Sequence, residues 1–229
     1  MARHQYGNTE TSDLWDALEA ETGEPVRRIA ESWIFQGGFP EVTVGLNGGS
    51  GVTLTQRRFA FDDGDGEAGG SEDERWSVPV VVRHDGDGGD AQRVLLDGDS
   101  TTVAIDGGAP GWVNANAGAH GFYRVRYTGA LLGGLLDHLS ALSPLERYTV
   151  VDDAWAAVLS GSITAADFVA LVERYGDERD LSVWERIVGG LGQIDRLADA
   201  DAAIALHARV AALTGPVRVE LGAEARPGD

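Results

Sequence analysis

The spacing of apolar residues divides the chain into three stretches of different periodicity. Between residues 13 and 35, apolar side chains recur every three or four positions, which is the spacing of one face of an α-helix. We expect two helices here, the first capped by Ser12 or Asp13 and the second with Pro25 in its first turn. The glycine pair at 37–38 should end the second helix, because glycine readily adopts the left-handed conformation of a helix stop.

From residue 40 onward the period changes to two. Val42, Val44 and Leu46 alternate with polar or small residues, as in a strand with one buried face. Turns rich in glycine and aspartate separate the other strand candidates, which cover residues 52–61, 76–83, 93–96, 101–105 and 121–127. Several short strands joined by such turns predict an antiparallel β-sandwich.

After Gly129 the pattern is helical. The segment 143–146, Ser-Pro-Leu-Glu, combines a capping box with proline at the first helical position, and similar start signals occur at 164–167 and 182–185. Another helix is expected over residues 202–213, and short loops imply antiparallel neighbours. The apolar stripes expected to be buried are Tyr148, Val151, Trp155, Val158 and Leu159, then Phe168, Leu171, Val172 and Tyr175, then Trp184, Ile187, Val188 and Leu191.

These patterns predict an α+β multidomain fold. A short helical N-terminal segment (1–39) should precede an antiparallel β-sandwich (40–128), and an antiparallel, HEAT-like α-helical stack (129–229) should follow. At 229 residues the chain can bury one or two hydrophobic cores.

Composition excludes several classes of function. The net charge of −19 repels phosphate backbones and anionic membrane surfaces, so we expect neither nucleic acid nor membrane as a partner. The absence of cysteine removes disulfides and thiolate chemistry. No apolar run approaches the roughly 20 residues of a membrane span, and the N-terminus lacks the apolar core of a signal peptide. A soluble, cytoplasmic protein is the resulting expectation.

Four motifs occur in an order that is informative in itself. They are NTETSDLW at 8–15, WIFQGGFPEVTV at 33–44, NAGAHGFYRVRY at 116–127 and LSPLERYTVVDDAWAAVLSG at 142–161, with Trp184 two helices further on. Together they resemble the aminopeptidase N family of zinc metallopeptidases, from the end of the catalytic domain through the β-sandwich into the helical domain. Arg126 departs from that likeness, since a small polar residue is common there.

The resemblance implies a parent enzyme that uses one zinc ion to remove N-terminal residues from peptides. Residues 1–39 would be a remnant of the end of its catalytic domain, and 129–229 a truncated helical domain. The G-A-M-E-N and H-E-x-x-H motifs of that family are absent from this sequence. The resemblance therefore transfers no catalytic, cofactor-binding or metal-binding residue, and we expect the chain to be inactive alone, with zinc belonging to the parent family and a catalytic metallopeptidase domain as its partner.

Residue chemistry by itself leads to the same expectation for metals. The five histidines are expected on the surface, half-buried or packed, because no two are four residues apart as a zinc helix requires: His4, His84, His120, His138 and His207. His207 is expected to be a packing residue. The acidic loop 62–75 places Asp63, Asp65, Glu67 and Glu74 in a calcium-loop register, but Ala68 replaces the required glycine. A solvated hairpin loop is favoured there over weak calcium binding.

The same loop contains a literal G-x-G-x-x-G at 64–69, which we interpret as chance, because acidic residues and not a helix N-terminus follow it. Adjacent Asp152 and Asp153 are not expected to share a site, since neighbouring helical residues point in different directions. A pair between Arg147 and a carboxylate is expected to fix helix packing. No G-x-S-x-G nucleophile motif is present.

In strand 121–127, alternate residues face opposite sides, so Tyr123, Val125 and Tyr127 should share one face, with one of the two faces forming core. Arg124, on the other face, is expected to anchor the β unit to a neighbouring domain through a carboxylate or carbonyls. A second hypothesis is a free-standing sandwich and helix module that binds proteins. The segment 13–35 distinguishes the two hypotheses. Without a partner, its apolar face, with Trp15, Ile29 and Trp33, must either fold back on the sandwich or stay exposed as a docking patch.

Overall fold

Two short helices precede the sheets. In the computed structural model, which describes residues 7–48, 51–62, 74–85, 90–105 and 108–222, they are α1 (Thr11–Thr22) and α2 (Val26–Ile34). Glu10, not Ser12 or Asp13, is the N-cap of α1, and Asp13 completes a capping box at the third helical position. Pro25 is itself the N-cap of α2, one position earlier than expected.

The second helix also ends earlier than the glycine pair. Phe35 is its C-cap, and Gly38 adopts a φ of +84° in the turn that leads into the first strand. Trp33 ties α2 to the sandwich, since its indole N–H donates to the carbonyl of Ser77 at 3.1 Å. Part of the N-terminal segment thus folds back on the sheets, whereas no residue of α1 is buried.

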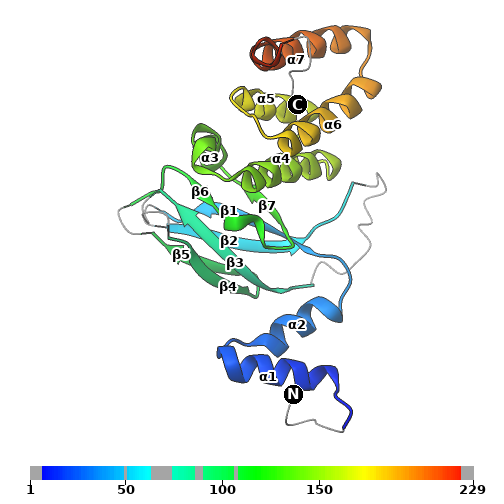
Figure 1. Cartoon of the computed structure of the whole chain (residues 1–229). Helices are drawn as coiled ribbons and strands as arrows, with labels where there is room; N and C mark the ends of the chain where they lie inside the picture. Colours follow the sequence, from blue (N-terminus) through cyan, green and yellow to red (C-terminus); the bar gives the residue numbers. More distant parts are fainter. Residues whose placement is uncertain (1–6, 49–50, 63–73, 86–89, 106–107, 223–229) are drawn as a thin grey trace.

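In the described part of the chain, seven strands form two facing sheets in the middle of the molecule (Figure 1). One sheet has the order β5-β2-β1-β7 and the other β4-β3-β6. The strands are β1 (Pro40–Leu46), β2 (Gly51–Arg58), β3 (Ser77–His84), β4 (Gln92–Asp97), β5 (Ser100–Ala104), β6 (Val113–Asn114) and β7 (Arg124–Tyr127). The sequence pattern located all but β6, whose two residues are too few to show a period.

The alternation of apolar residues builds the core between the sheets. Every second residue is fully buried, from Val42, Val44, Val52 and Leu54 in one sheet to Val78, Val80, Val82 and Leu96 in the other. Full burial of each such side chain contributes about 1.5–3 kcal/mol. A shift of register by one residue would expose the whole set, so the alternation specifies the pairing of strands.

One strand pair departs from the expected antiparallel pattern. β7 pairs in parallel with β1, with Val125 opposite Val42, while the other strand pairs in the described residues are antiparallel. Parallel neighbours need a long connection, and here the chain passes through the second sheet before it returns as β7. β7 is an edge strand, and this position matters for the site below.

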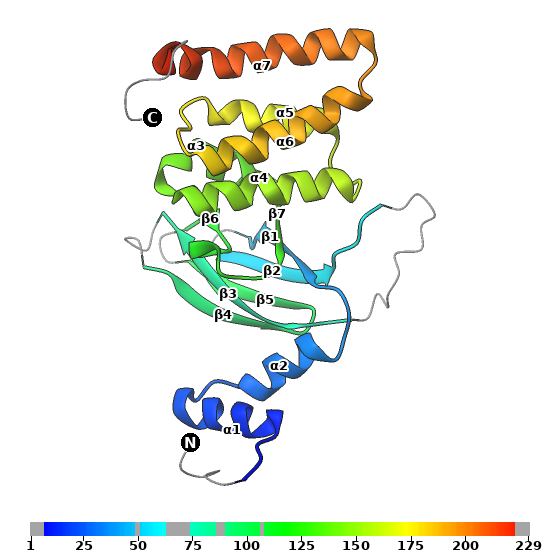
Figure 2. The ribbon, with the colours of Figure 1, turned by 45° about the vertical axis from the view of Figure 1, so that its right-hand side comes forward.

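The helical unit lies on the side of the sandwich opposite α1 and α2 (Figure 2). It comprises α3 (Leu131–Asp137), α4 (Pro144–Leu159), α5 (Ala165–Val172), α6 (Leu181–Leu197) and α7 (Ala200–Leu221), with short 3₁₀ turns at Leu139–Ala141 and Glu173–Tyr175. A further 3₁₀ turn, Ala117–Ala119, lies between β6 and β7. Its core includes Val151, Trp155, Phe168, Tyr175 and Ile187.

The expected capping boxes are confirmed for α4 at Ser143 and Glu146 and for α5 at Thr164 and Asp167. The third signal was wrong, because Asp180 caps α6 and accepts the backbone N–H groups of residues 182 and 183. Asp180 is the N-cap in place of Ser182 because its carboxylate accepts two backbone N–H groups that are free in the first turn of α6.

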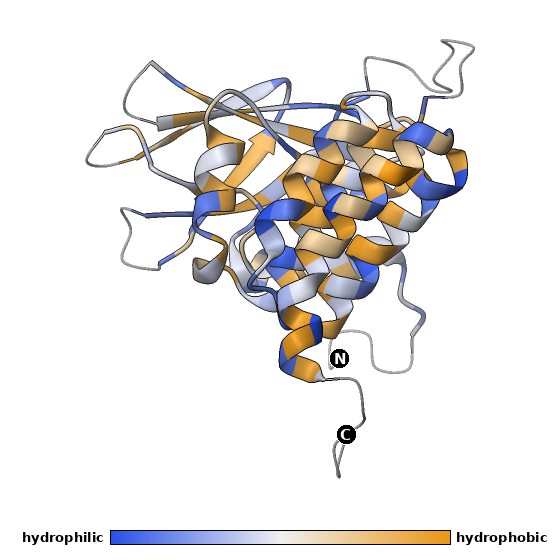
Figure 3. Ribbon diagram, turned by 90° about the horizontal axis from the view of Figure 1, so that it is seen from above, coloured by the Kyte–Doolittle hydropathy of each residue, from blue (hydrophilic) through white to orange (hydrophobic). Residues whose placement is uncertain are grey.

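Two residues assigned to buried stripes are exposed. Leu159 lies in the last turn of α4, and Val188 lies on the open face of α6. The outermost helix, α7, contains many apolar residues, and the view of the molecule from above shows apolar positions on the helices nearest the viewer (Figure 3). Leu206 and Leu213 of α7 are buried, whereas Ile204 and Val219 are exposed. None of the described helices is long and apolar enough to cross a membrane.

Candidate functional site

The joint between the sandwich and the helical unit is built around one buried carboxylate. Glu146, at the third position of α4, accepts hydrogen bonds from Arg83 Nη2 at 2.9 Å and from Asn114 Nδ2 at 3.0 Å. The backbone N–H groups of Gly118 and Ser143 donate to the same carboxylate at 2.9 and 2.7 Å. One side chain therefore joins β3, β6 and the Ala117–Ala119 turn to the start of α4.

These partners determine the charge of Glu146. Burial by itself would raise the pKa of this carboxyl, but the N–H groups of Gly118 and Ser143, the Ser143 side chain and Arg83 together hold the pKa below its usual range. Glu146 is thus ionised when the chain is folded. These donors to the Glu146 carboxylate are all groups of the protein, so this side chain connects structural elements.

A second set of ionic contacts joins β7 to the middle of α4. Arg124 binds Asp152, and its Nη1 also donates to Asp153 Oδ1 at 3.2 Å. Arg186 Nε of α6 donates to Asp152 Oδ1 at 2.7 Å, so β7, α4 and α6 are connected in one row. The expectation that Arg124 anchors the β unit through a carboxylate is confirmed.

The expectation that Asp152 and Asp153 do not share a site was wrong. Both carboxylates contact Arg124, although they are adjacent in α4. The planar guanidinium of Arg124 can donate to two acceptors that approach from different directions. It therefore contacts both carboxylates although they leave the helix in different directions.

Asp153 has an unusual protonation equilibrium. Burial raises the pKa of its carboxyl to about 7, and the charge of Arg124 offsets only part of that effect. Its Oδ2 accepts the backbone N–H of Val125 at 3.1 Å. A helix side chain therefore occupies a hydrogen-bonding position on the free edge of β7, which would otherwise be open to pairing with another strand.

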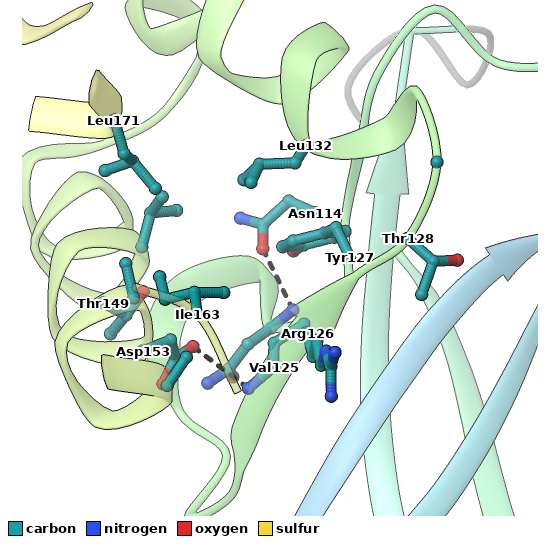
Figure 4. A pocket seen from close by; sticks show the side chains of 15 residues that line it. Asn114, Val125, Arg126, Tyr127, Thr128, Leu132, Thr149, Asp153, Ile163 and Leu171 are labelled. Atoms are coloured by element: carbon teal, nitrogen blue, oxygen red, sulfur yellow. Dashed lines mark hydrogen bonds between the residues drawn. The ribbon is translucent and has the colours of Figure 1, made fainter. Parts of the chain in front are cut away.

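A pocket of about 330 Å³ lies beside this contact, lined by β7, α3, α4, the segment before α5 and Leu171 near the end of α5 (Figure 4). Val125, Leu132, Ile163 and Leu171 supply much of its apolar wall. Its polar groups come mainly from the segment 114–129 and from α4, among them Asn114, Asn116, Arg126, Tyr127, Thr128, Thr149 and Asp153.

A row of aromatic rings forms a separate surface on the sandwich. Ring centroids lie 5.1–6.3 Å apart along the series Trp33, Phe122, Phe39, Phe59 and Phe61, and we call these five residues the aromatic surface. Phe59 is buried, whereas Phe122 is 73% and Phe61 is 58% exposed. Phe35, at the end of α2, is 81% exposed. Exposed large apolar residues that adjoin one another in this way mark contact sites for another protein segment.

The face assignment of the last strand is confirmed in part by burial. Tyr123 and Val125 are buried in the sandwich core, with Tyr127 packed against it, and the hydroxyl of Tyr123 donates to the carbonyl of Ala115 at 2.8 Å. Burial raises the pKa of both tyrosines. The opposite face carries Phe122, Arg124 and Arg126; Phe122 makes the aromatic contacts and Arg124 the ionic contacts described above.

The expected ion pair of Arg147 is confirmed, and its partner is Glu178. Arg147 Nε and Nη2 donate to the two oxygens of Glu178 at 2.6 and 2.9 Å. The Glu178 carboxylate is buried, and it also accepts backbone N–H groups of residues 179 and 180. This pair fixes the loop before α6 against α4, as a packing role requires.

The histidines are scattered. His84 is buried in β3, His120 is exposed, and His138 lies close to its own helix through Nδ1 and the carbonyl of Gly134 at 2.8 Å. The expected packing role of His207 was wrong, since its Nε2 lies 2.7 Å from Asp195 Oδ1 and the side chain is mostly exposed. His4 lies outside the described residues.

The described residues offer no fit for a metal. They contain no group of three or more histidine, aspartate or glutamate side chains able to hold an ion. Of the proposed calcium ligands, Glu74 instead binds Arg58, whereas Asp63, Asp65 and Glu67 lie outside the described residues, as does the glycine pattern at 64–69. That the chain carries no catalytic, cofactor or metal residue stays a prediction.

Comparison with known proteins gives matches that run along most of the chain. The family model described as ERAP1-like C-terminal domain matches residues 112–229. Tricorn protease-interacting factor F2 of Thermoplasma acidophilum is 31% identical over 82% of this chain and 22% of its own length. Puromycin-sensitive aminopeptidase of Caenorhabditis elegans is 32% identical over 85% of this chain and 21% of its own length. Aminopeptidase M1 of Arabidopsis thaliana is 31% identical over 82% of this chain and 22% of its own length. The chain thus spans about a fifth of the length of these relatives.

Proposed function

Because this chain belongs to the ERAP1-like C-terminal domain family and corresponds to the C-terminal part of an aminopeptidase N-like enzyme, we propose that it is a non-catalytic scaffold for a zinc aminopeptidase. The enzyme would remove N-terminal residues from peptides. The sandwich would support the metallopeptidase catalytic domain, and the helical unit would cap the cavity in which peptides bind. Zinc would be held by that catalytic domain and not by this chain.

The aromatic surface is the observation that carries this proposal. It lies where α2, the start of β1, the end of β2 and the start of β7 come together, and its outer rings are left uncovered by the described residues. Burying an exposed phenylalanine against a partner contributes about 1.5–3 kcal/mol, so two or three such rings supply a sizeable part of a stable domain contact.

Its position also favours a partner that is joined to this segment. Phe35 and Phe122 frame the passage from α2 into β1, where the resemblance places the end of a catalytic domain. The matched relatives are about five times as long as the part that this chain covers, so in them comparable segments adjoin much additional protein.

The ionic joint supports a rigid scaffold. Glu146 and the row Arg124–Asp152–Arg186 connect the sandwich to α4 and α6 through side chains that are at least partly buried. Buried ionic contacts that are fully hydrogen-bonded favour one relative orientation of two units. A cap over a peptide cavity needs such an orientation.

The first test is activity. The zinc-loaded chain is expected to show no turnover of leucine p-nitroanilide above a metal-only control. Turnover that scales with the concentration of purified chain and disappears with chelator would contradict the scaffold proposal.

The second test concerns the aromatic surface. The chain is expected to bind a hydrophobic fluorescent dye or to self-associate, and Phe122→Ser combined with Phe61→Ser should reduce either effect several-fold. Val219→Ser, at an exposed apolar residue of α7, is the matched control. A cooperative monomer whose weak dye binding does not change with these substitutions would instead favour the free-standing interaction module.

A further inference from the structure

The pocket between β7 and α4 combines an apolar wall with a cation that has no carboxylate partner among the described residues. Its volume of about 330 Å³ lies within the range of small-molecule sites. Leu132 and Leu171 lie at the upper end of Figure 4, and Asp153 and Arg126 at the lower end. Ile163 and Val125 also lie at that lower end, so apolar side chains adjoin the charged ones there.

Arg126 is the cation. Most described arginines bind a carboxylate, as expected for a chain with 37 acidic and 18 basic residues. No carboxylate of the described residues lies within 4.0 Å of Arg126, although the side chain is half-buried. A guanidinium keeps its proton at any physiological pH and offers five N–H donors, so a half-buried one without a partner favours the approach of an anion.

The other polar groups of the pocket are already bonded within the protein. Asn114 donates to Glu146, Asn116 exchanges two hydrogen bonds with Gly121, and Thr128 donates to the carbonyl of Val44. Thr149 donates to the carbonyl of Glu146. The N–H groups of the Arg126 guanidinium are consequently the main hydrogen-bond donors that this pocket offers to a ligand.

Tyr127 adds one more donor. Its hydroxyl accepts the backbone N–H of Ala115 at 3.1 Å, and its own hydrogen has no acceptor among the described residues. Asp153 is the one acidic residue of the lining, and burial raises its pKa to about 7. Its repulsion of an anion is thereby reduced at neutral and lower pH.

We propose that this pocket binds a small monocarboxylic acid with an apolar body, whose carboxylate pairs with Arg126 while the body contacts Leu132, Ile163 and Leu171. Such a ligand matches the pocket in charge and in polarity. The single cation, Arg126, favours a single anionic group, and the apolar wall favours a ligand body without further polar groups. The site lies apart from the aromatic surface, so the proposal does not depend on the scaffold role.

Calorimetric or NMR titration of the full chain with 4-phenylbutyrate tests the proposal, with 4-phenylbutanol as the uncharged counterpart. The acid is expected to bind saturably at one site, and the alcohol at least tenfold more weakly. Arg126→Gln should weaken binding of the acid at least tenfold. Arg196→Gln, at an exposed arginine of α6 far along the chain from the pocket, should leave it unchanged.

Ala157→Leu provides a second variant, because it adds volume to the pocket wall and should abolish binding of both compounds. Urea unfolding establishes that each variant folds, and the Arg126→Gln result decides if Ala157→Leu does not. Equal affinity for the acid and the alcohol, no saturable binding, or undiminished binding by Arg126→Gln would overturn the proposal.

Discussion

The backbone N–H of Val125 donates to the carboxylate of Asp153 at 3.1 Å, so α4 closes the free edge of β7. The same carboxylate contacts Arg124 of that strand. The strand that ends the sandwich is therefore attached to the first long helix through its backbone as well as through side chains. The sandwich and the helical unit share this contact, which makes it a sensitive place to test how they depend on each other.

Replacing Asp153 by alanine should lower the free energy of unfolding by about 1–3 kcal/mol, because the buried N–H of Val125 loses its acceptor. Arg124 keeps Asp152, so its charge is not left unpaired. Urea unfolding followed by tryptophan fluorescence measures the change. Asp177→Ala, at an exposed aspartate, is the control and should stay within about 0.5 kcal/mol of the parent chain. Equal effects of the two substitutions would contradict the role of Asp153.

Stability should decrease as the pH rises between about 5 and 7. The pKa of Asp153 is about 7 in the folded chain and about 3.9 in an unfolded one, so in this window the folded state binds more protons. Its contribution is complete below pH ~4 and is lost as the pH rises through 7, by about 4 kcal/mol in all, since each pKa unit of difference corresponds to about 1.4 kcal/mol. Arg124 and Asp152 are the charged groups that face Asp153, and neither changes charge in this window.

Asp153→Asn tests the origin of this pH dependence. The amide oxygen can still accept the Val125 N–H, but the side chain no longer titrates. Urea unfolding at a series of pH values should give a flatter profile between pH 5 and 8 for the variant than for the parent chain. An unchanged slope in the variant would assign the effect to another group.

Replacing Glu146 by alanine should cost about 3–5 kcal/mol, because Arg83 and Asn114 lose a buried partner and α4 loses part of its capping box. Since these contacts join the sandwich to the helices, unfolding should also separate into two steps. Circular dichroism follows the helices and tryptophan fluorescence follows both units. Glu185→Ala, at an exposed glutamate of α6, should retain the parent's behaviour. A single transition of unchanged midpoint in Glu146→Ala would exclude the connecting role.

Neighbouring glycines of α3 should respond in opposite ways to alanine. A Cβ on Gly134 would lie 2.0 Å from the carbonyl oxygen of Gly111, so Gly134→Ala must push α3 away from the sandwich at a cost of about 1–3 kcal/mol. A Cβ on Gly133 meets nothing within 4 Å, so Gly133→Ala should stabilise the helix by about 0.5–1 kcal/mol. The difference between their thermal midpoints measures the close approach. Two variants of equal stability would mean that α3 does not pack as described.

Sequence and structure agree where a signal is local. The capping boxes at Ser143 and Thr164 depend on residues three positions apart, and both helices start there. The alternation of Val42 and Val44 placed β1, because one strand face must be buried whatever lies opposite. The start of α6 predicted at Ser182 was wrong, because Asp180 caps this helix. Both side chains can accept the same free N–H groups, and the sequence pattern does not show which of them does.

The site was less accessible to sequence reasoning. The sequence identified Arg124 as an anchor and Arg147 as half of an ion pair, because the planar guanidinium group suits carboxylate and carbonyl acceptors. Their partners lie 28 and 31 residues away, and nothing in the pattern selected Asp152 or Glu178. The sequence assigned no role to Arg126, since only the folded structure shows that no carboxylate of the described residues lies within ion-pair distance of it.

Local sequence patterns were sufficient to predict the order of helices and strands, the buried face of most of them, and kinship with an aminopeptidase N-like enzyme. Periodicity and capping act over a few residues, so the chain carries them without reference to its fold. The packing of distant segments established that β7 runs parallel to β1, that Asp153 closes its edge, and that Arg126 lies beside an apolar pocket without a carboxylate partner in the described part of the chain. These features depend on contacts between distant segments, whose distances and burial are set only when both domains pack together.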